Sequence, residues 1–122
     1  MRPRAIAFAA ACALTLLLTT PDSASAAIGD FHYTYVDAAG AEQREKIDGR
    51  DYKDDVIPDG VCIDIKEAED PAKTKPAHSP LNSTNTRALV FEEESCVGAR
   101  YVLAADGKGG VNLKFRSVLF QA

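Results

Sequence analysis

The 122-residue chain has few residues of the kinds that bind metals, with two histidines and three cysteines. A structural zinc site needs four such ligands close together, and these few are scattered along the chain. Sequence motifs of enzyme active sites are also missing, since no G-x-S-x-G, H-E-x-x-H or phosphate-binding glycine loop occurs. We therefore expect no catalytic residues, no metal ligands and no cofactor, and the sequence argues against an enzyme.

A basic stripe is lacking as well. Residues 27–70 hold thirteen acidic against five basic side chains, and residues 71–122 hold four against seven. Nucleic acids and anionic membrane surfaces both attract clustered lysine and arginine, so we expect neither as a partner. The uneven charge fits two halves that pack together and solvate their outer faces, and an acidic face for a cationic partner is the alternative.

No apolar run reaches the length of about 20 residues that crosses a bilayer. The longest run, residues 5–18, follows Arg2 and Arg4 and precedes Ala24-Ser25-Ala26, which fits the small-x-small pattern of signal peptidase. This layout predicts that residues 1–26 are a cleaved signal peptide and that residues 27–122 form a single secreted, extracellular domain. A retained membrane anchor is the alternative.

Cleavage would discard Cys12 and leave two cysteines, Cys62 and Cys96. In an oxidising compartment an even count with one possible connectivity predicts a Cys62–Cys96 disulfide, and two free thiols are the alternative. A domain of this size buries a modest fraction of its surface, so a covalent link matters to its stability.

Short alternating segments separated by turns predict an all-β protein, a small Greek-key sandwich or barrel. Residues 41–47 are compatible with a short helix as well, because Ala, Glu, Gln and Lys favour helices. In contrast, residues 67–86 hold three prolines and many small polar residues, which predicts one long loop between halves at about 28–66 and 87–122. The strands are expected at residues 31–36, 41–47, 61–65, 87–92, 99–103 and 111–120.

Residues 88–101 (ALVFEEESCVGARY) resemble the first hairpin of a βγ-crystallin Greek-key motif. Phe91, Glu92 and Gly98 match the motif, and Cys96 stands where its second aromatic residue would be. Ser117 resembles the serine that ties down the folded hairpin in that family. The resemblance implies a crystallin-like fold.

Residues 33–40, followed by residues 61–65, resemble a degenerate first copy of the motif without its serine. The pattern is also similar to small secreted actinobacterial proteins, and some crystallin-like relatives inhibit metallopeptidases or resemble killer toxins. Because unrelated functions share one fold, the resemblance speaks to architecture more than to activity.

Four sets of polar residues are candidates for a site. Five aspartates crowd residues 48–59, where a solvated acidic loop is favoured over a calcium site because their spacing is not that of an EF-hand. The pair His78-Ser79 falls in the predicted loop, which offers no rigid scaffold for nucleophilic catalysis. His32 is expected to be a structural histidine on a strand, and residues 92–94 a solvated turn.

The long loop suggests a binding role. A disulfide-linked β scaffold with a proline-containing loop has the layout of a binding protein, because proline lowers the cost of ordering a loop on binding. We expect a secreted, non-enzymatic binding or interaction module whose partner is an extracellular protein or envelope component. A peptidase inhibitor acting through residues 67–86 is the alternative function.

Overall fold

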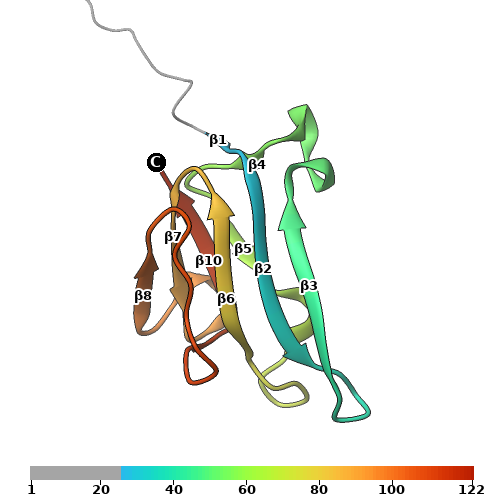
Figure 1. The fold of residues 1–122 in the computed structure, drawn as a ribbon. Helices are drawn as coiled ribbons and strands as arrows, with labels where there is room; N and C mark the ends of the chain where they lie inside the picture. Colours follow the sequence, from blue (N-terminus) through green and yellow to red (C-terminus); the bar gives the residue numbers. More distant parts are fainter. Residues whose placement is uncertain (1–25) are drawn as a thin grey trace, which may run out of the picture.

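The computed structural model describes residues 26–122 and shows an all-β sandwich of two four-stranded antiparallel sheets (Figure 1). The predicted fold class is confirmed. The predicted signal peptide, apart from its last residue, lies outside the described residues. Among residues 26–122 no helix combines the length and apolarity needed to cross a bilayer.

The strands are β1 (Ala26–Ala27), β2 (Gly29–Val36), β3 (Glu42–Asp48), β4 (Ile57–Pro58), β5 (Cys62–Asp64), β6 (Ala77–Thr84), β7 (Arg87–Phe91), β8 (Arg100–Leu103), β9 (Lys114–Phe115) and β10 (Ser117–Gln121). Four short 3₁₀ turns lie between them, η4 (Gly49–Asp51), η5 (Lys53–Asp55), η6 (Lys66–Ala68) and η7 (Glu94–Cys96).

The two sheets exchange edge strands. The first sheet has the order β3-β2-β6-β9 and the second has the order β5-β10-β7-β8. Each sheet therefore takes three strands from one part of the chain and one short edge strand from the other part. A small ribbon of β1 and β4 closes one end of the sandwich.

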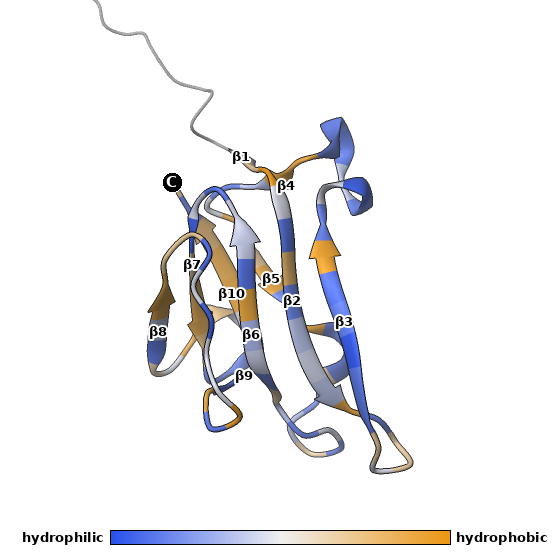
Figure 2. Cartoon of the chain, viewed as in Figure 1, coloured by the Kyte–Doolittle hydropathy of each residue, from blue (hydrophilic) through white to orange (hydrophobic). Residues whose placement is uncertain are grey.

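The core lies between the sheets and is built on phenylalanines. Phe31 from β2 makes edge-to-face contacts with Phe115 and Phe120, at ring-centroid distances of 6.0 and 5.6 Å, and all three are fully buried. Such pairs contribute about 0.5–1.5 kcal/mol beyond the burial of their area. Figure 2 shows the apolar residues concentrated on β7 and β10, whereas β3 is hydrophilic along most of its length. That pattern agrees with the place of β3 at a sheet edge, and the alternative of a helix over residues 41–47 is wrong.

The prediction of one long loop over residues 67–86 is wrong, because β6 occupies residues 77–84 and pairs with both β2 and β9. Its sequence, AHSPLNST, lacks the usual pattern of a strand for two reasons. Its fully buried positions include the polar Asn82, and Pro80 cannot donate a backbone hydrogen bond. A bulge in the pairing with β2, between His32 and Thr34, accommodates the irregular segment.

The predicted closing strand over residues 111–120 is two strands in different sheets. The chain crosses between the sheets at Arg116, which lies between β9 and β10. Val61 and Val111, the first residues of the strands expected at residues 61–65 and 111–120, are 49% and 63% exposed. Both precede the observed strands, β5 and β9, so the alternation of those strands does not extend to them.

Candidate functional site

A cleft of about 410 Å³ opens at the side of the sandwich where the edge strands β3 and β5 face each other. Its apolar lining is Tyr33, Ile47, Tyr52, Ile63 and Ile65. Its charged lining is Glu45, Lys46, Asp51, Asp64 and Lys66. The cleft thus offers two tyrosines and an aliphatic floor inside a rim that carries both signs of charge.

The acidic segment shapes one end of this cleft. The Asp48 carboxylate accepts a hydrogen bond from the Arg50 backbone N–H at 2.8 Å, which caps η4. It also lies 3.2 Å from the Arg50 guanidinium and 3.5 Å from the Lys46 ammonium. These cationic and hydrogen-bond partners hold the pKa of Asp48 below its usual range, with the Arg50 hydrogen bond as the largest cause. The turn ends at Tyr52, whose ring packs against the core at the edge of the cleft.

Tyr33 forms the inner wall of the cleft and is locked in its neutral form. Its hydroxyl donates a 2.7 Å hydrogen bond to Glu67 Oε1. Burial, followed by the hydrogen bond and the negative charge of Glu67, raises the pKa of Tyr33 far above that of a free tyrosine. Burial, helped by the charge of Asp51, also raises the pKa of Tyr52. Both hydroxyls therefore remain protonated at neutral pH and serve as hydrogen-bond groups, not as bases.

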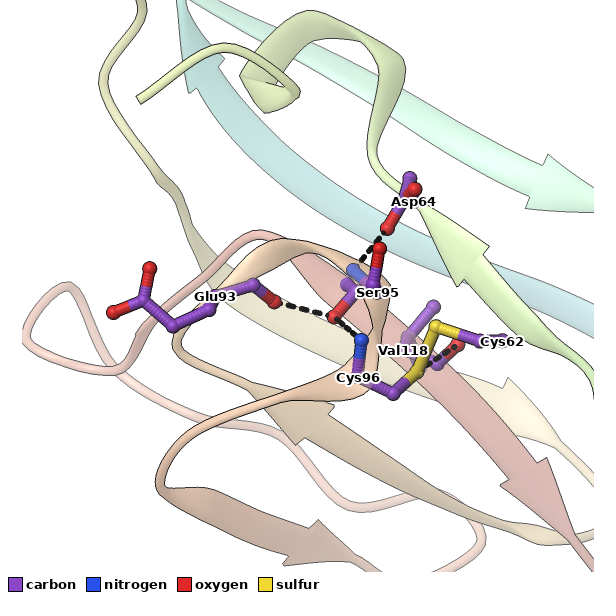
Figure 3. Close-up of a disulfide and its surroundings, with 7 residues drawn as sticks. Cys62, Asp64, Glu93, Ser95, Cys96 and Val118 are labelled. Atoms are coloured by element: carbon purple, nitrogen blue, oxygen red, sulfur yellow. Dashed lines mark hydrogen bonds between the residues drawn. A yellow bond between two sulfur atoms is a disulfide. The ribbon is translucent and has the colours of Figure 1, made fainter. Parts of the chain in front are cut away.

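The predicted Cys62–Cys96 disulfide is confirmed, and it anchors the other wall of the cleft (Figure 3). Strand β5 is only three residues long and pairs with β10 alone, so its position depends on further attachments. The disulfide ties its first residue to η7, with a Cα–Cα distance of 5.9 Å. The Ser95 backbone N–H also donates to the Asp64 carboxylate at 2.7 Å. Two contacts thus fix β5 to the turn after β7.

Ser117 fixes the same turn, η7, through two hydrogen bonds. Its hydroxyl donates to Glu93 O at 2.6 Å and accepts from Cys96 N at 2.9 Å. The hydroxyl and the disulfide together fix the folded hairpin against β10.

The remaining acidic candidates do not assemble into a site. In the part of the chain that the structure describes, no three His, Cys, Asp or Glu side chains lie close enough to hold a metal ion. Of the five aspartates in residues 48–59, only Asp51 lines the cleft. Residues 92–94 lie at the turn after β7, mostly exposed. His32 lies on β2 near Asp30, at 4.0 Å.

The expectation that His78 and Ser79 lie in a flexible segment is wrong, because both belong to β6. His78 is buried, and its ring contacts Ser79 on one side and Glu42 on the other. The alternation rule fails for this segment because its inward positions are small or polar.

The mostly exposed remainder of the predicted loop is residues 69–76, and the side chain of Arg116 fixes its position. The buried Arg116 guanidinium donates to Ala68 O at 2.9 Å and to Thr74 O at 3.0 Å. Lys73 and Lys75 project from this segment into solvent. The segment is thus a short, anchored turn.

Sequence reasoning missed the cleft itself. Its lining comes from three separated segments on two sheets, and no local pattern links them. One available signal was Tyr52, the single aromatic residue in an otherwise polar stretch. Comparison of the chain with protein-family models, with curated proteins and with solved structures found no match.

Proposed function

We propose that the protein is a secreted, non-enzymatic binding module and that the cleft between β3 and β5 holds part of its extracellular partner. The observation that carries this proposal is the cleft of about 410 Å³ with two tyrosines over an isoleucine floor. Apolar surface supplies affinity in such sites, and a few fixed polar groups supply orientation. The partly exposed Tyr52, with its neutral hydroxyl, suits a partner segment that carries hydrogen-bonding groups.

We infer further that the chain is a crystallin-like Greek-key protein that acts outside the cytoplasm. The Ser117 hydroxyl, which ties the turn after β7, supports the crystallin-like assignment. The Cys62–Cys96 disulfide supports an oxidising compartment, where such bonds persist.

The test is a pull-down from culture medium with the mature domain as bait, followed by mass spectrometry and sugar analysis of what is retained. Tyr52→Ala is the cleft variant, because Tyr52 lies at the cleft edge and is only partly buried. Tyr101→Ala, on the far edge strand β8 and 54% exposed, is the matched control.

A protein or envelope component retained by the wild type and the control but lost with Tyr52→Ala would support the cleft. Equal recovery on all three baits would contradict it. The nature of the retained material distinguishes an extracellular protein from a wall polysaccharide.

Peptidase inhibition by residues 69–76 is a second candidate function, favoured by the anchorage of this segment on Arg116. An exposed turn held rigid loses little entropy when a peptidase binds it. Lys73 would then be the side chain read by a peptidase that prefers basic residues. Inhibition of such a peptidase by the wild type, with loss in Lys73→Ala and not in Lys53→Ala, would establish this activity. No inhibition at high protein concentration would exclude it.

A further inference from the structure

The outer face of the first sheet carries a chain of three polar side chains that is separate from the cleft. In a regular strand, neighbouring side chains point to opposite faces. Ser79 instead has a left-handed backbone, with φ of 54°, next to the bulge in the pairing of β6 with β2. As a result its hydroxyl lies 2.8 Å from Nδ1 of the preceding residue, His78. Bulges re-aim side chains in this way, and backbone strain of this kind clusters at functional sites.

The second ring nitrogen of His78 fixes the direction of these hydrogen bonds. Nε2 lies 3.1 Å from the carboxylate of Glu42, which reaches across β2 from the edge strand β3. An ionised carboxylate only accepts hydrogen bonds, so Nε2 must carry the proton and donate it to Glu42. In the neutral ring Nδ1 is then the acceptor, and the Ser79 hydroxyl donates to it. This is the arrangement of nucleophile, general base and orienting acid, with the two ring nitrogens in the reverse of their order in serine proteases.

Burial supports the arrangement. The His78 side chain is 9% exposed, so its ring is held in place and little water competes for its nitrogens. Ser79 is only partly buried, so a reagent can approach this residue from solvent. A buried base between a hydroxyl and a carboxylate is what the activation of a serine requires.

We propose that Ser79 is a nucleophile that accepts the acyl group of an activated ester, with His78 as its general base and Glu42 as a positioning residue. In this step a bond forms between Ser79 Oγ and the acyl carbon, and the bond from that carbon to the leaving oxygen breaks. The Ser79 proton moves to Nδ1 of His78 and then to the leaving group. The product is an ester on Ser79.

The backbone around Ser79 restricts which esters react. Its own N–H donates to Gly110 O at 3.2 Å, and so it does not stabilise an oxyanion. The acyl donor must therefore carry a good leaving group, such as a phenolate. One acylation per molecule is sufficient for covalent attachment, so the proposal adds a reaction to a binding module without requiring turnover.

The experiment treats the mature domain with p-nitrophenyl acetate and with a fluorophosphonate probe, and follows phenolate release and intact mass. We expect one adduct per molecule on Ser79, located by peptide mapping, and none in Ser79→Ala. Ser83→Ala is the matched control, because Ser83 is an exposed serine on the same strand. His78→Gln should slow labelling by about 100-fold or more, the lower range for a general base.

Glu42→Gln tests the positioning role, because Glu42 is 65% exposed and its loss leaves the core intact. We expect a lower maximal labelling rate with an unchanged half-saturating probe concentration and an unchanged melting temperature. If His78→Gln does not fold, Glu42→Gln alone decides the matter. Absence of an adduct in the wild type, an adduct elsewhere than Ser79, or unchanged rates in Glu42→Gln would each overturn the proposal.

Discussion

Asn82 takes the place of an apolar residue in the core of β6. It is fully buried, and its amide NH₂ donates to the carbonyl oxygens of Thr86, Leu103 and Ala104 at 2.8 to 3.2 Å. Its Oδ1 accepts from the Thr84 hydroxyl at 2.6 Å. One side chain thus satisfies polar groups from β6, β8 and the turns beside them.

Replacing Asn82 should therefore be costly. In Asn82→Ala the carbonyls stay buried without donors, and we expect the free energy of unfolding to fall by about 3 kcal/mol. Ser83→Ala, next to it and exposed, should change stability by less than about 0.5 kcal/mol. Urea unfolding of both variants checks this, and equal stability would show that water replaces the amide.

Tyr33 makes stability depend on alkaline pH. Because its pKa is raised in the folded state, its contribution is complete below the pKa of an unfolded tyrosine, about 10, and is lost as the pH rises above that value. We expect the free energy of unfolding to fall with pH above about 10, and to fall less steeply in Tyr33→Phe. Denaturant titrations at several alkaline pH values measure the slope. Tyr101→Phe is the control, and the same slope in Tyr33→Phe as in wild type would refute the assignment.

At the residue scale, the sequence predicts contacts that follow from the type and number of the residues, without knowledge of the packing. The pairing of Cys62 with Cys96 follows from compartment and count, and the structure confirms it. The partners of Asn82 and the contact of His78 with Glu42 depend on long-range packing, so no local pattern reveals them. The same holds for Tyr33 and Glu67, which are 34 residues apart.

Among the elements, β6 is the strand on which the integrity of the first sheet depends most. It lies between β2 and β9, so its backbone hydrogen bonds hold the first sheet together. Replacing residues 77–84 with a Gly/Ser linker of equal length should abolish cooperative unfolding. The same replacement at residues 70–73, which are exposed, should cost about 1 kcal/mol or less, because loop closure depends weakly on sequence and length. Circular dichroism melts distinguish the two, and a cooperative melt without β6 would contradict this account.

The element that most needs the disulfide is β5. Cys62→Ala/Cys96→Ala removes a bond that closes a segment with a sequence separation of 34, which should lower stability by about 3–4 kcal/mol. We also expect faster amide exchange in β5 than in β7, because β5 has one strand partner and β7 has two. Calorimetry and hydrogen exchange measure these effects. A double variant that melts like wild type would show that the bond is not needed.

The elements that the sequence predicts are those with alternating apolar residues. Strands β2, β5, β7 and β8 fall within one or two residues of their expected bounds, because an apolar face is visible in each. Strand β3 was ambiguous, since its solvated edge position places few constraints on its residues. The crossing at Arg116 was missed because both flanking strands continue the same alternation.

For the whole molecule, the predicted cleavage position lies next to Ala27, the second residue of β1. This residue is fully buried and pairs with Ile57, so cleavage after Ala26 leaves an ordered first residue. We expect the secreted protein to begin at Ala27. Sequencing of its N-terminus checks this, and material that retains Leu16-Leu17-Leu18 would contradict the signal-peptide prediction.

The position of β10 determines when the second sheet can be completed. It is the last strand along the sequence, yet it lies inside its sheet, between β5 and β7. Neither β5 nor β7 can complete its backbone pairing in this sheet until β10 is in place. During synthesis, which proceeds from the N-terminus, this sheet is therefore completed only after β10 has emerged. Pairing between strands that are far apart along the chain raises the contact order, and high contact order slows folding.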